Sequence, residues 1–102
     1  MKQEGKKFDS EKADWSLINM KQLEGLADVL TYGAKKYDRH NWVNVEPYRY
    51  FAALLRHISA WQSGETIDDE SKLHHLHHAM ANLYFLLEHE RIGKGYSFQN
   101  EK

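Results

Sequence analysis

The sequence predicts an all-α fold, namely a bundle of three principal helices preceded by an extended N-terminal arm. Apolar residues recur at spacings of three and four in three separate stretches, which is the period of an amphipathic helix. No stretch sustains the alternation of apolar and polar residues that is typical of a β-strand. We therefore expect a single helical domain over residues 1–102, with an arm at 1–14, a helical core at 15–92 and a polar tail at 93–102.

The first helix is expected from about Met20 to Lys36. The residues of its predicted apolar face are Leu23, Leu26, Ala27, Leu30 and Ala34. The segment from Tyr37 to Glu46 lacks this period and is expected to be an ordered loop.

The second helix is expected to begin at Pro47, because proline suits the first helical turn, where its missing N–H would have no partner. It should run to Ser63, with Gly64 ending it. The residues of its predicted apolar face are Tyr48, Phe51, Ala52, Leu55, Ile58 and Trp61.

The third helix is expected to follow the acidic turn Asp68-Asp69-Glu70, with Asp68 or Asp69 as its N-cap, and to extend to about Arg91. A seam of apolar residues should pack on the other helices or on another subunit. Its members are Leu73, Leu76, Met80, Leu83 and Leu87.

Composition limits the classes of function. The formal net charge is −1, so no global basic field is available to hold a nucleic acid, and we expect no stable nucleic-acid partner. The chain has no cysteine, so any metal must be held by nitrogen and oxygen ligands. No apolar run approaches the ~20 residues of a membrane span, and a cytoplasmic location is expected. A chain of 102 residues has a modest core, which favours a homo-oligomer, a dimer or a tetramer.

Four of the seven histidines fall within five positions, at 74, 75, 77 and 78. On a helix, His75 and His78 share one face with Asn82, whereas His74 and His77 lie on another. The row of His75 and His78 is the better functional candidate, because the small Ala79 beside it leaves room for a ligand. The alternative is that these histidines form hydrogen bonds at a helix surface or interface.

The acidic turn could supply Asp68 and Glu70 as oxygen ligands for Mg²⁺ or Mn²⁺, which bridge to phosphate oxygens. Its alternative role is to cap the third helix. Glu24 and Asp28, one turn apart on the first helix, could form a second carboxylate pair for a metal, but a solvated face is the favoured expectation.

The end of the first helix and the following loop combine groups that suit a nucleotide. Lys35 and Lys36 could meet phosphates, Asn41 could read a base edge, and Tyr37 or Trp42 could stack on the base. Alternatively, the aromatic residues pack the loop onto the core and the lysines contact helix carbonyls.

The pair Arg56-His57 in the second helix is open in the same way. Arg56 could grip a phosphate, or it could pair with an acid such as Asp28 or Glu70.

Taken together, several stretches resemble the phage and bacterial dATP/dGTP diphosphohydrolase N-terminal domain family, close to the all-α MazG-like nucleotide pyrophosphatases. The matching stretches within residues 6–90 are Lys7-Phe8-Asp9, Lys12, Trp15, Leu30 to Tyr37, Asn41-Trp42, Arg49 to Ala53, Arg56-His57, Gly64-Glu65, Asp68 to Ser71, His75-Leu76, His78-Ala79 and Asn82. The resemblance implies an all-α fold, metal-dependent hydrolysis of a purine deoxynucleoside triphosphate to the monophosphate and pyrophosphate, and assembly from more than one subunit.

The sequence departs from the family pattern at several places. In the arm, Glu11-Lys12-Ala13-Asp14-Trp15 stands where Gly-Lys-Pro-Arg-Trp is expected, and His74 and His77 are not part of the pattern. Lys72 stands where a glycine is usual. The paired acidic motifs of standard MazG-like enzymes are absent from consecutive helices, and Arg56-His57 and His75-x-x-His78 stand in their places.

The leading hypothesis is therefore a nucleotide pyrophosphatase that uses Mg²⁺ or Mn²⁺. Its predicted catalytic residues are His75, His78 and Glu70, and its predicted metal ligands are Asp68 and Glu70. The predicted substrate-binding residues are Lys35, Lys36, Tyr37, Asn41, Trp42, Arg56, His57 and Asn82. The competing hypotheses are a module that binds a nucleotide or nucleotide signal without hydrolysing it, and a structural helical protein whose histidines stabilise an interface.

Overall fold

The structure, a computed structural model, describes residues 10–95, so most of the predicted arm and tail lies outside the described residues. Its elements in chain order are η1 (Trp15–Leu17), α1 (Met20–Lys36), η2 (Asn41–Asn44), α2 (Pro47–Gln62) and α3 (His75–Arg91). Within residues 10–95 there is no β-strand, only one isolated antiparallel bridge between Ile67 and His74. The all-α fold class is confirmed.

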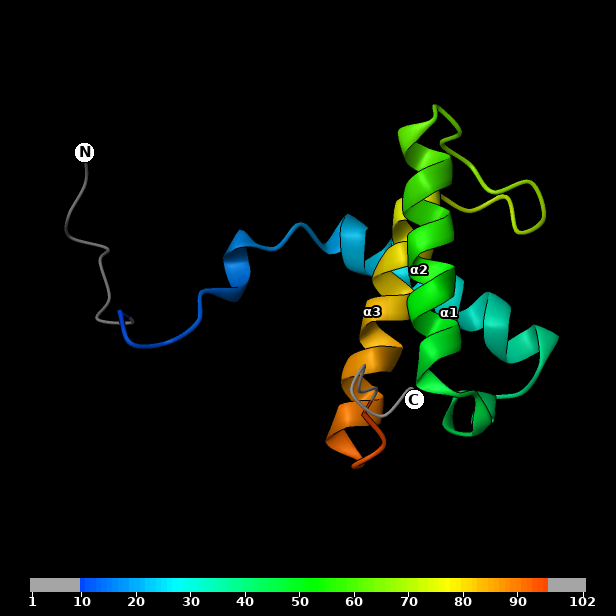
Figure 1. Cartoon of the computed structure of the whole chain (residues 1–102). Helices are drawn as coiled ribbons and strands as arrows, with labels where there is room; N and C mark the ends of the chain where they lie inside the picture. Colours follow the sequence, from blue (N-terminus) through cyan, green and yellow to red (C-terminus); the bar gives the residue numbers. More distant parts are fainter. Residues whose placement is uncertain (1–9, 96–102) are drawn as a thin grey trace.

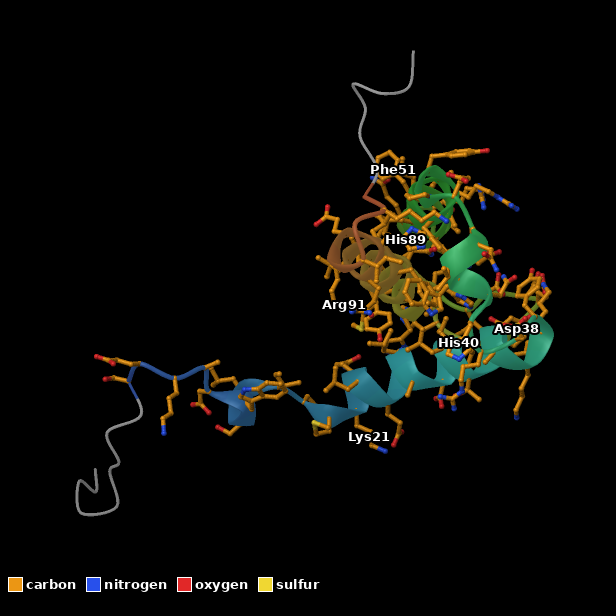
Figure 2. The ribbon with its side chains drawn as sticks, turned by 90° about the horizontal axis from the view of Figure 1, so that it is seen from below. Lys21, Asp38, His40, Phe51, His89 and Arg91 are labelled. Atoms are coloured by element: carbon orange, nitrogen blue, oxygen red, sulfur yellow. The ribbon has the colours of Figure 1, made fainter. Side chains whose placement is uncertain are left out.

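The helix α3 is the centre of the bundle. It lies beside α2 along much of its length, and α1 crosses it and packs on it as well (Figure 1). The segment that carries η1 projects away from the three helices, as the view from below also shows (Figure 2). The loop between α1 and α2 contacts α3 through Trp42 and His89, and the loop between α2 and α3 contacts it through Ser71 and His78.

The boundaries of the first two helices follow the predictions. Asn19 caps α1, because its Oδ1 accepts the backbone N–H of Lys21 at 2.9 Å. Pro47 occupies the start of α2, and Ser63 is its C-cap. Gly64 follows with a φ of 106°, a left-handed conformation that glycine adopts without steric cost.

The predicted start of the third helix is wrong. Helix α3 begins at His75, with His74 as its N-cap, rather than directly after Asp68 or Asp69. The residues between form a loop closed by backbone hydrogen bonds, including Asp68 N to Leu73 O and His75 N to Thr66 O, at 2.8 and 2.9 Å. Lys72 has a φ of 64°, which a helix cannot continue through. Asp68 caps this loop instead of the helix.

The predicted apolar faces are only partly buried. On α1 the buried residue is Val29, whereas Ala27 and Ala34 are exposed. Leu55 and Ile58 of α2 and Leu83 and Leu87 of α3 are also exposed. The reason is that α3 turns small and polar side chains inward, which allow close helix packing and leave the leucines outside. Its buried residues are His75, Ala79, Ala81, Asn82 and His89.

Within residues 10–95, no helix combines the length and the apolar character that crossing a membrane requires.

Candidate functional site

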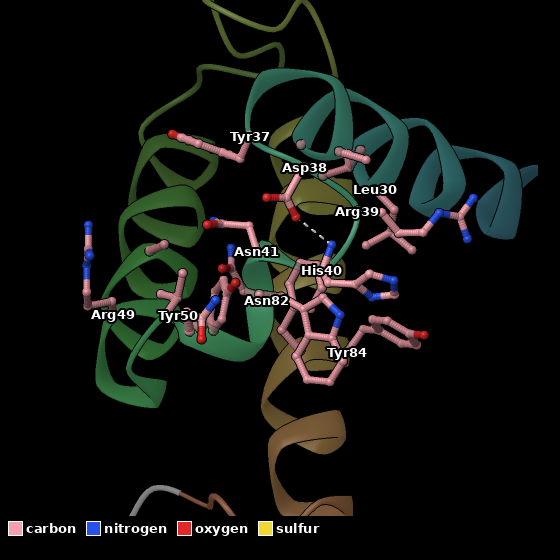
Figure 3. A pocket seen from close by; sticks show the side chains of 18 of the residues that line it. Leu30, Tyr37, Asp38, Arg39, His40, Asn41, Arg49, Tyr50, Asn82 and Tyr84 are labelled. Carbon is pink, nitrogen blue, oxygen red and sulfur yellow. Dashed lines mark hydrogen bonds between the residues drawn. The ribbon is translucent and has the colours of Figure 1, made fainter.

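A cavity of about 1170 Å³ lies between the end of α1, the loop through η2, and helices α2 and α3 (Figure 3). This volume is large enough for a nucleotide. Five of the predicted substrate-binding residues line it, namely Tyr37, Asn41, Trp42, Arg56 and Asn82. Lys35, Lys36 and His57 lie outside its lining.

The loop that carries Trp42 is fixed to α3. The Trp42 ring stacks on Phe85 and His89, with ring centroids 5.9 and 5.4 Å apart. His89 is fully buried, and its Nε2 donates to the Trp42 carbonyl at 2.8 Å. Lys94 Nζ donates to the carbonyl of Val43. Trp42 therefore packs on the core and lines the cavity at the same time, so the two readings of this loop are compatible.

Two asparagines lie near the middle of the cavity view, whereas Arg39 and Arg49 lie toward opposite edges (Figure 3). Asn82 is buried, and its Nδ2 donates to the backbone carbonyl of His78 at 2.9 Å. This bond orients the amide and leaves Oδ1 to accept a hydrogen bond from a ligand.

Three arginines among the lining residues provide positive charge. Within residues 10–95, Arg39, Arg49 and Arg56 form no ion pair with an acidic side chain, and Arg56 pairs with neither Asp28 nor Glu70. Their guanidinium groups are therefore available to an anionic ligand.

A cluster of histidines and acids lies where α2, the 65–74 loop and α3 meet. His57 Nδ1 and His75 Nδ1 are 2.8 Å apart, and His75 Nε2 is 2.6 Å from Glu65 Oε1. Since the Glu65 carboxylate can only accept, His75 carries its proton on Nε2. The lone pair of His75 Nδ1 then faces His57.

The same cluster contains a second chain of hydrogen bonds. Ser71 donates its backbone N–H and its hydroxyl to Asp68 Oδ2, both at 2.8 Å. The Ser71 hydroxyl oxygen lies 2.7 Å from His78 Nε2, so that nitrogen must be the donor. The rings of His57 and His78 stack with centroids 4.5 Å apart. His78 thus carries its proton on Nε2, and its Nδ1, which forms no hydrogen bond within residues 10–95, can accept one.

The electrostatics favour neutral imidazoles and an ionised carboxylate near pH 7. Burial lowers the pKa of His57 to about 4, and the neighbouring His78 and His75 act in the same direction. Burial also lowers the pKa of His78, although the charge of Asp68 opposes it. For Asp68, burial raises the pKa, but the Ser71 hydrogen bonds outweigh this and the net pKa is lowered.

Glu70, predicted to be a metal ligand and a catalytic residue, contacts α1 instead of this cluster. It accepts hydrogen bonds from the Tyr32 hydroxyl at 2.6 Å and from Lys36 Nζ. The hydrogen bonds from Lys36 and Tyr32 lower the pKa of Glu70, so it remains a carboxylate. Two predicted site residues, Glu70 and Lys36, thus hold the acidic loop against the first helix. Lys35 is exposed.

The two other histidines of the run are outside the cluster. His74 Nδ1 accepts the backbone N–H of Leu76 at 3.0 Å, which caps α3. The ring of His77 occupies the space beside Gly25 of α1 and lies 2.9 Å from Gln22 Oε1.

Sequence reasoning missed several residues that shape these sites. Glu65 and Ser71 orient histidines, and Tyr50 and Phe85 stack beside Trp42. Burial raises the pKa of Tyr50 to about 12. Arg49, which lines the cavity, was also missed as a binding residue. Its position two helical turns before Arg56, on the same side of α2, was a sequence signal that could have identified it. The contacts of Glu65 and Ser71 depend on the shape of the loop, for which the sequence pattern offers no period.

Comparisons with known proteins agree with the family named from the motifs. The family model described as dATP/dGTP diphosphohydrolase, N-terminal, matches residues 2–99. A dATP/dGTP diphosphohydrolase of Salmonella phage PMBT28 is 40% identical over 82 residues, which are 80% of this chain. The match spans only 28% of the length of that phage protein. No solved structure matches the chain. The chain belongs to the dATP/dGTP diphosphohydrolase N-terminal family.

Proposed function

We propose that the protein hydrolyses a purine deoxynucleoside triphosphate, dATP or dGTP, to the monophosphate and pyrophosphate with the help of a divalent ion. The observation that carries the proposal is the adjacency of the cavity and the histidine cluster. Arg56 lines the cavity and precedes His57 on α2, and Asn82 lines the cavity and bonds to the carbonyl of His78 on α3. A nucleotide in the cavity could therefore extend its phosphates toward the cluster.

The base would occupy the part of the cavity formed by Tyr37, Asn41 and Trp42. Aromatic rings provide flat apolar surfaces for a purine, and amides offer both donors and acceptors to its edge. Because α3 already orders Trp42, binding would cost little side-chain entropy at this position.

The phosphates would be held first by Arg56, whose guanidinium can contact two phosphate oxygens. Lys35 and Lys36, at the end of α1, remain candidates for the outer phosphates. Lys36 would have to exchange its Glu70 partner for a phosphate, which would couple substrate binding to the position of the acidic loop.

The reaction requires a water oxygen to attack the α-phosphorus while the bond to the bridging oxygen of the β-phosphate breaks. The water proton would pass to a neutral imidazole, and His78 Nδ1 is our first choice because Ser71 fixes its proton on the other nitrogen. Mg²⁺ or Mn²⁺, when bound, would neutralise the phosphate charge and make the water more acidic. A deoxynucleotide substrate also implies action in the cytoplasm, the host's if the protein is phage-encoded.

We also propose that the chain acts as a homo-oligomer, a dimer or a tetramer. Large apolar side chains are exposed on the single chain at several places, among them Leu87 at 65%, Leu55 at 51% and Trp15 at 75%. Association would cover such surfaces. Light scattering after size-exclusion chromatography should give a mass at least twice that of one chain.

The function is tested by incubating the purified protein with dATP, dGTP, the pyrimidine deoxynucleotides and the ribonucleotides, with Mg²⁺ or Mn²⁺, and separating the products. We expect pyrophosphate and the monophosphate from the purine deoxynucleotides. Arg56→Ala should lower kcat/KM by about 100-fold. Arg91→Ala is the matched control, because Arg91 pairs with Glu88 at the far end of α3.

The other outcomes separate the hypotheses. Release of inorganic phosphate in place of pyrophosphate contradicts the bond assignment. Tight binding with the nucleotide recovered unchanged identifies a non-catalytic binding module. If the protein neither binds nor hydrolyses a nucleotide, the hypothesis of a structural helical protein is supported.

A further inference from the structure

The histidine cluster brings together metal-binding atoms from three separate parts of the chain. His57 of α2, Asp68 of the loop and His75 of α3 offer donor atoms that all lie within 4.8 Å of one another. The two imidazole nitrogens that approach most closely are 2.8 Å apart, so only one proton can lie between them. A cation could replace that proton and be bound by both lone pairs.

The neighbours of these three residues orient them as ligands. The Glu65 carboxylate holds the proton of His75 on Nε2 and so turns the lone pair of Nδ1 toward His57. A carboxylate that accepts from the far nitrogen of a histidine is the usual outer partner of a metal-bound imidazole. Within residues 10–95, both hydrogen bonds that the Asp68 carboxylate accepts go to Oδ2, which leaves Oδ1 for an ion.

The donor set differs from that of a magnesium site. Mg²⁺ prefers oxygen ligands and retains several waters, whereas imidazole nitrogens suit Zn²⁺, Fe²⁺, Ni²⁺ and Cu²⁺. Glu70, which would have made the set richer in oxygen, is bonded to Lys36 and Tyr32. Three protein ligands would also leave a coordination position for water or phosphate, as in catalytic zinc sites.

We propose that His57, Asp68 and His75 form a three-ligand site for a first-row transition-metal ion that favours nitrogen ligands, with Zn²⁺ as its representative, rather than a site for Mg²⁺. Glu65 is a positioning residue of this site because it acts through His75. The site would serve the hydrolysis proposed above, but ion binding can be measured without nucleotide. The two proposals can therefore fail separately.

The experiment uses the full chain after removal of metals with a chelator. Calorimetric titration with Zn²⁺ and with Mg²⁺, together with elemental analysis after dialysis, gives affinity and stoichiometry. We expect one tightly bound Zn²⁺ per chain and much weaker binding of Mg²⁺. Co²⁺, used as a spectroscopic probe, should give the visible absorption bands of an ion with mixed nitrogen and oxygen ligands.

Variants locate the site. His57→Gln and His75→Gln should abolish tight Zn²⁺ binding, whereas His74→Gln and His77→Gln, which change histidines outside the cluster on the same helix, should retain it. Asp68→Asn should weaken binding while an amide oxygen still accepts the Ser71 hydrogen bonds, so a folded variant is available. Glu65→Gln should lower the affinity by about 10- to 100-fold. Circular dichroism of each variant checks that it is folded.

Three results would overturn the inference. The first is the absence of tight Zn²⁺ binding to the folded chain. The second is tight binding that survives both His57→Gln and His75→Gln. The third is an equal or higher affinity for Mg²⁺. If Zn²⁺ binds as expected but no triphosphate is hydrolysed, the metal site stands and the proposed function fails. If triphosphate is hydrolysed with Mg²⁺ but the folded chain does not bind Zn²⁺ tightly, the function stands and the metal site fails.

Discussion

The two histidine pairs of the 74–78 run are close in sequence but contact different parts of the molecule. His75 and His78 face α2 and the acidic loop, where Glu65, Ser71 and Asp68 determine their tautomers. His74 caps α3, and His77 packs on α1. A one-residue step along a helix rotates a side chain by about 100°, which is enough to move it from one neighbour to another. Residue type alone therefore says little about the role of a histidine, and the helix face says much more.

The largest expected effect on activity is at His75, the buried member of the cluster. His75→Ala should lower kcat/KM for the proposed substrate by about 100-fold or more, because it removes a member of the cluster. His77→Ala should leave kcat/KM little changed. The measurement is the rate of pyrophosphate release, with circular dichroism as the control for folding. Equal losses in the two variants would show that the two helix faces do not differ in function.

The second prediction concerns pH and stability. The pKa of His57 is lowered from 6.5 to about 4, so between these values the unfolded chain binds a proton that the folded chain does not. The contribution of neutral His57 to the free energy of unfolding is therefore complete above about pH 6.5 and is lost as the pH falls toward 4. The lowered pKa of His78 acts in the same direction. Thermal unfolding should therefore show Tm falling by several degrees between about pH 7 and about pH 5.

Substitutions assign this fall to the cluster. His57→Gln should flatten the dependence of Tm on pH, whereas His77→Gln should preserve it. A dependence that stays steep in His57→Gln would place the responsible group elsewhere.

The third prediction tests the packing role of His77. A Cβ added at Gly25 would lie 2.2 Å from His77 Cε1, so Gly25→Ala should force the ring to move. The free energy of unfolding should fall by about 1 kcal/mol, which is the overpacking cost after the gain in helix propensity. Chemical denaturation measures it. In the His77→Ala background the same substitution should no longer destabilise, and a cost that persists there would contradict the contact.

The smallest expected effect is at Lys72, in the loop that orients His75 and His78. Lys72 has a φ of 64°, a left-handed conformation that is unfavourable for a side chain with a Cβ. Lys72→Gly should raise the free energy of unfolding by up to about 1 kcal/mol, because glycine adopts this conformation without strain. The gain is reduced because glycine also gives the unfolded chain more conformational entropy. Lys72→Ala, which retains a Cβ, should give no comparable gain. Denaturation midpoints of the three proteins decide the matter.

Local signals predicted the helices well because each boundary depends on neighbouring residues. Pro47 and Gly64, at the two ends of α2, act through their own backbone chemistry. The start of α3 was misplaced because Asp68 and Ser71 bond to each other and build a loop. An acidic residue before a helical stretch looks the same in the sequence whether it caps the helix or closes a loop in front of it.

The buried faces of the helices were harder to predict, because small and polar residues, rather than leucines, make the close contacts between helices. Gly25 accommodates His77, and Ala79 and Ala81 allow close approach on α3. The pairing of Lys36 with Glu70 and of His75 with Glu65 joins residues whose proximity only the folded chain determines. The tautomers that make the cluster a candidate site therefore could not be predicted from spacing.

A crystal structure with a transition-metal ion and a non-hydrolysable dGTP analogue tests most directly whether the cavity and the histidine cluster form one site. We expect the base beside Trp42, the phosphates near Arg56 and the ion bound by His57, Asp68 and His75. A nucleotide held elsewhere on the protein, or one in the cavity with its phosphates directed away from these histidines, would contradict this expectation.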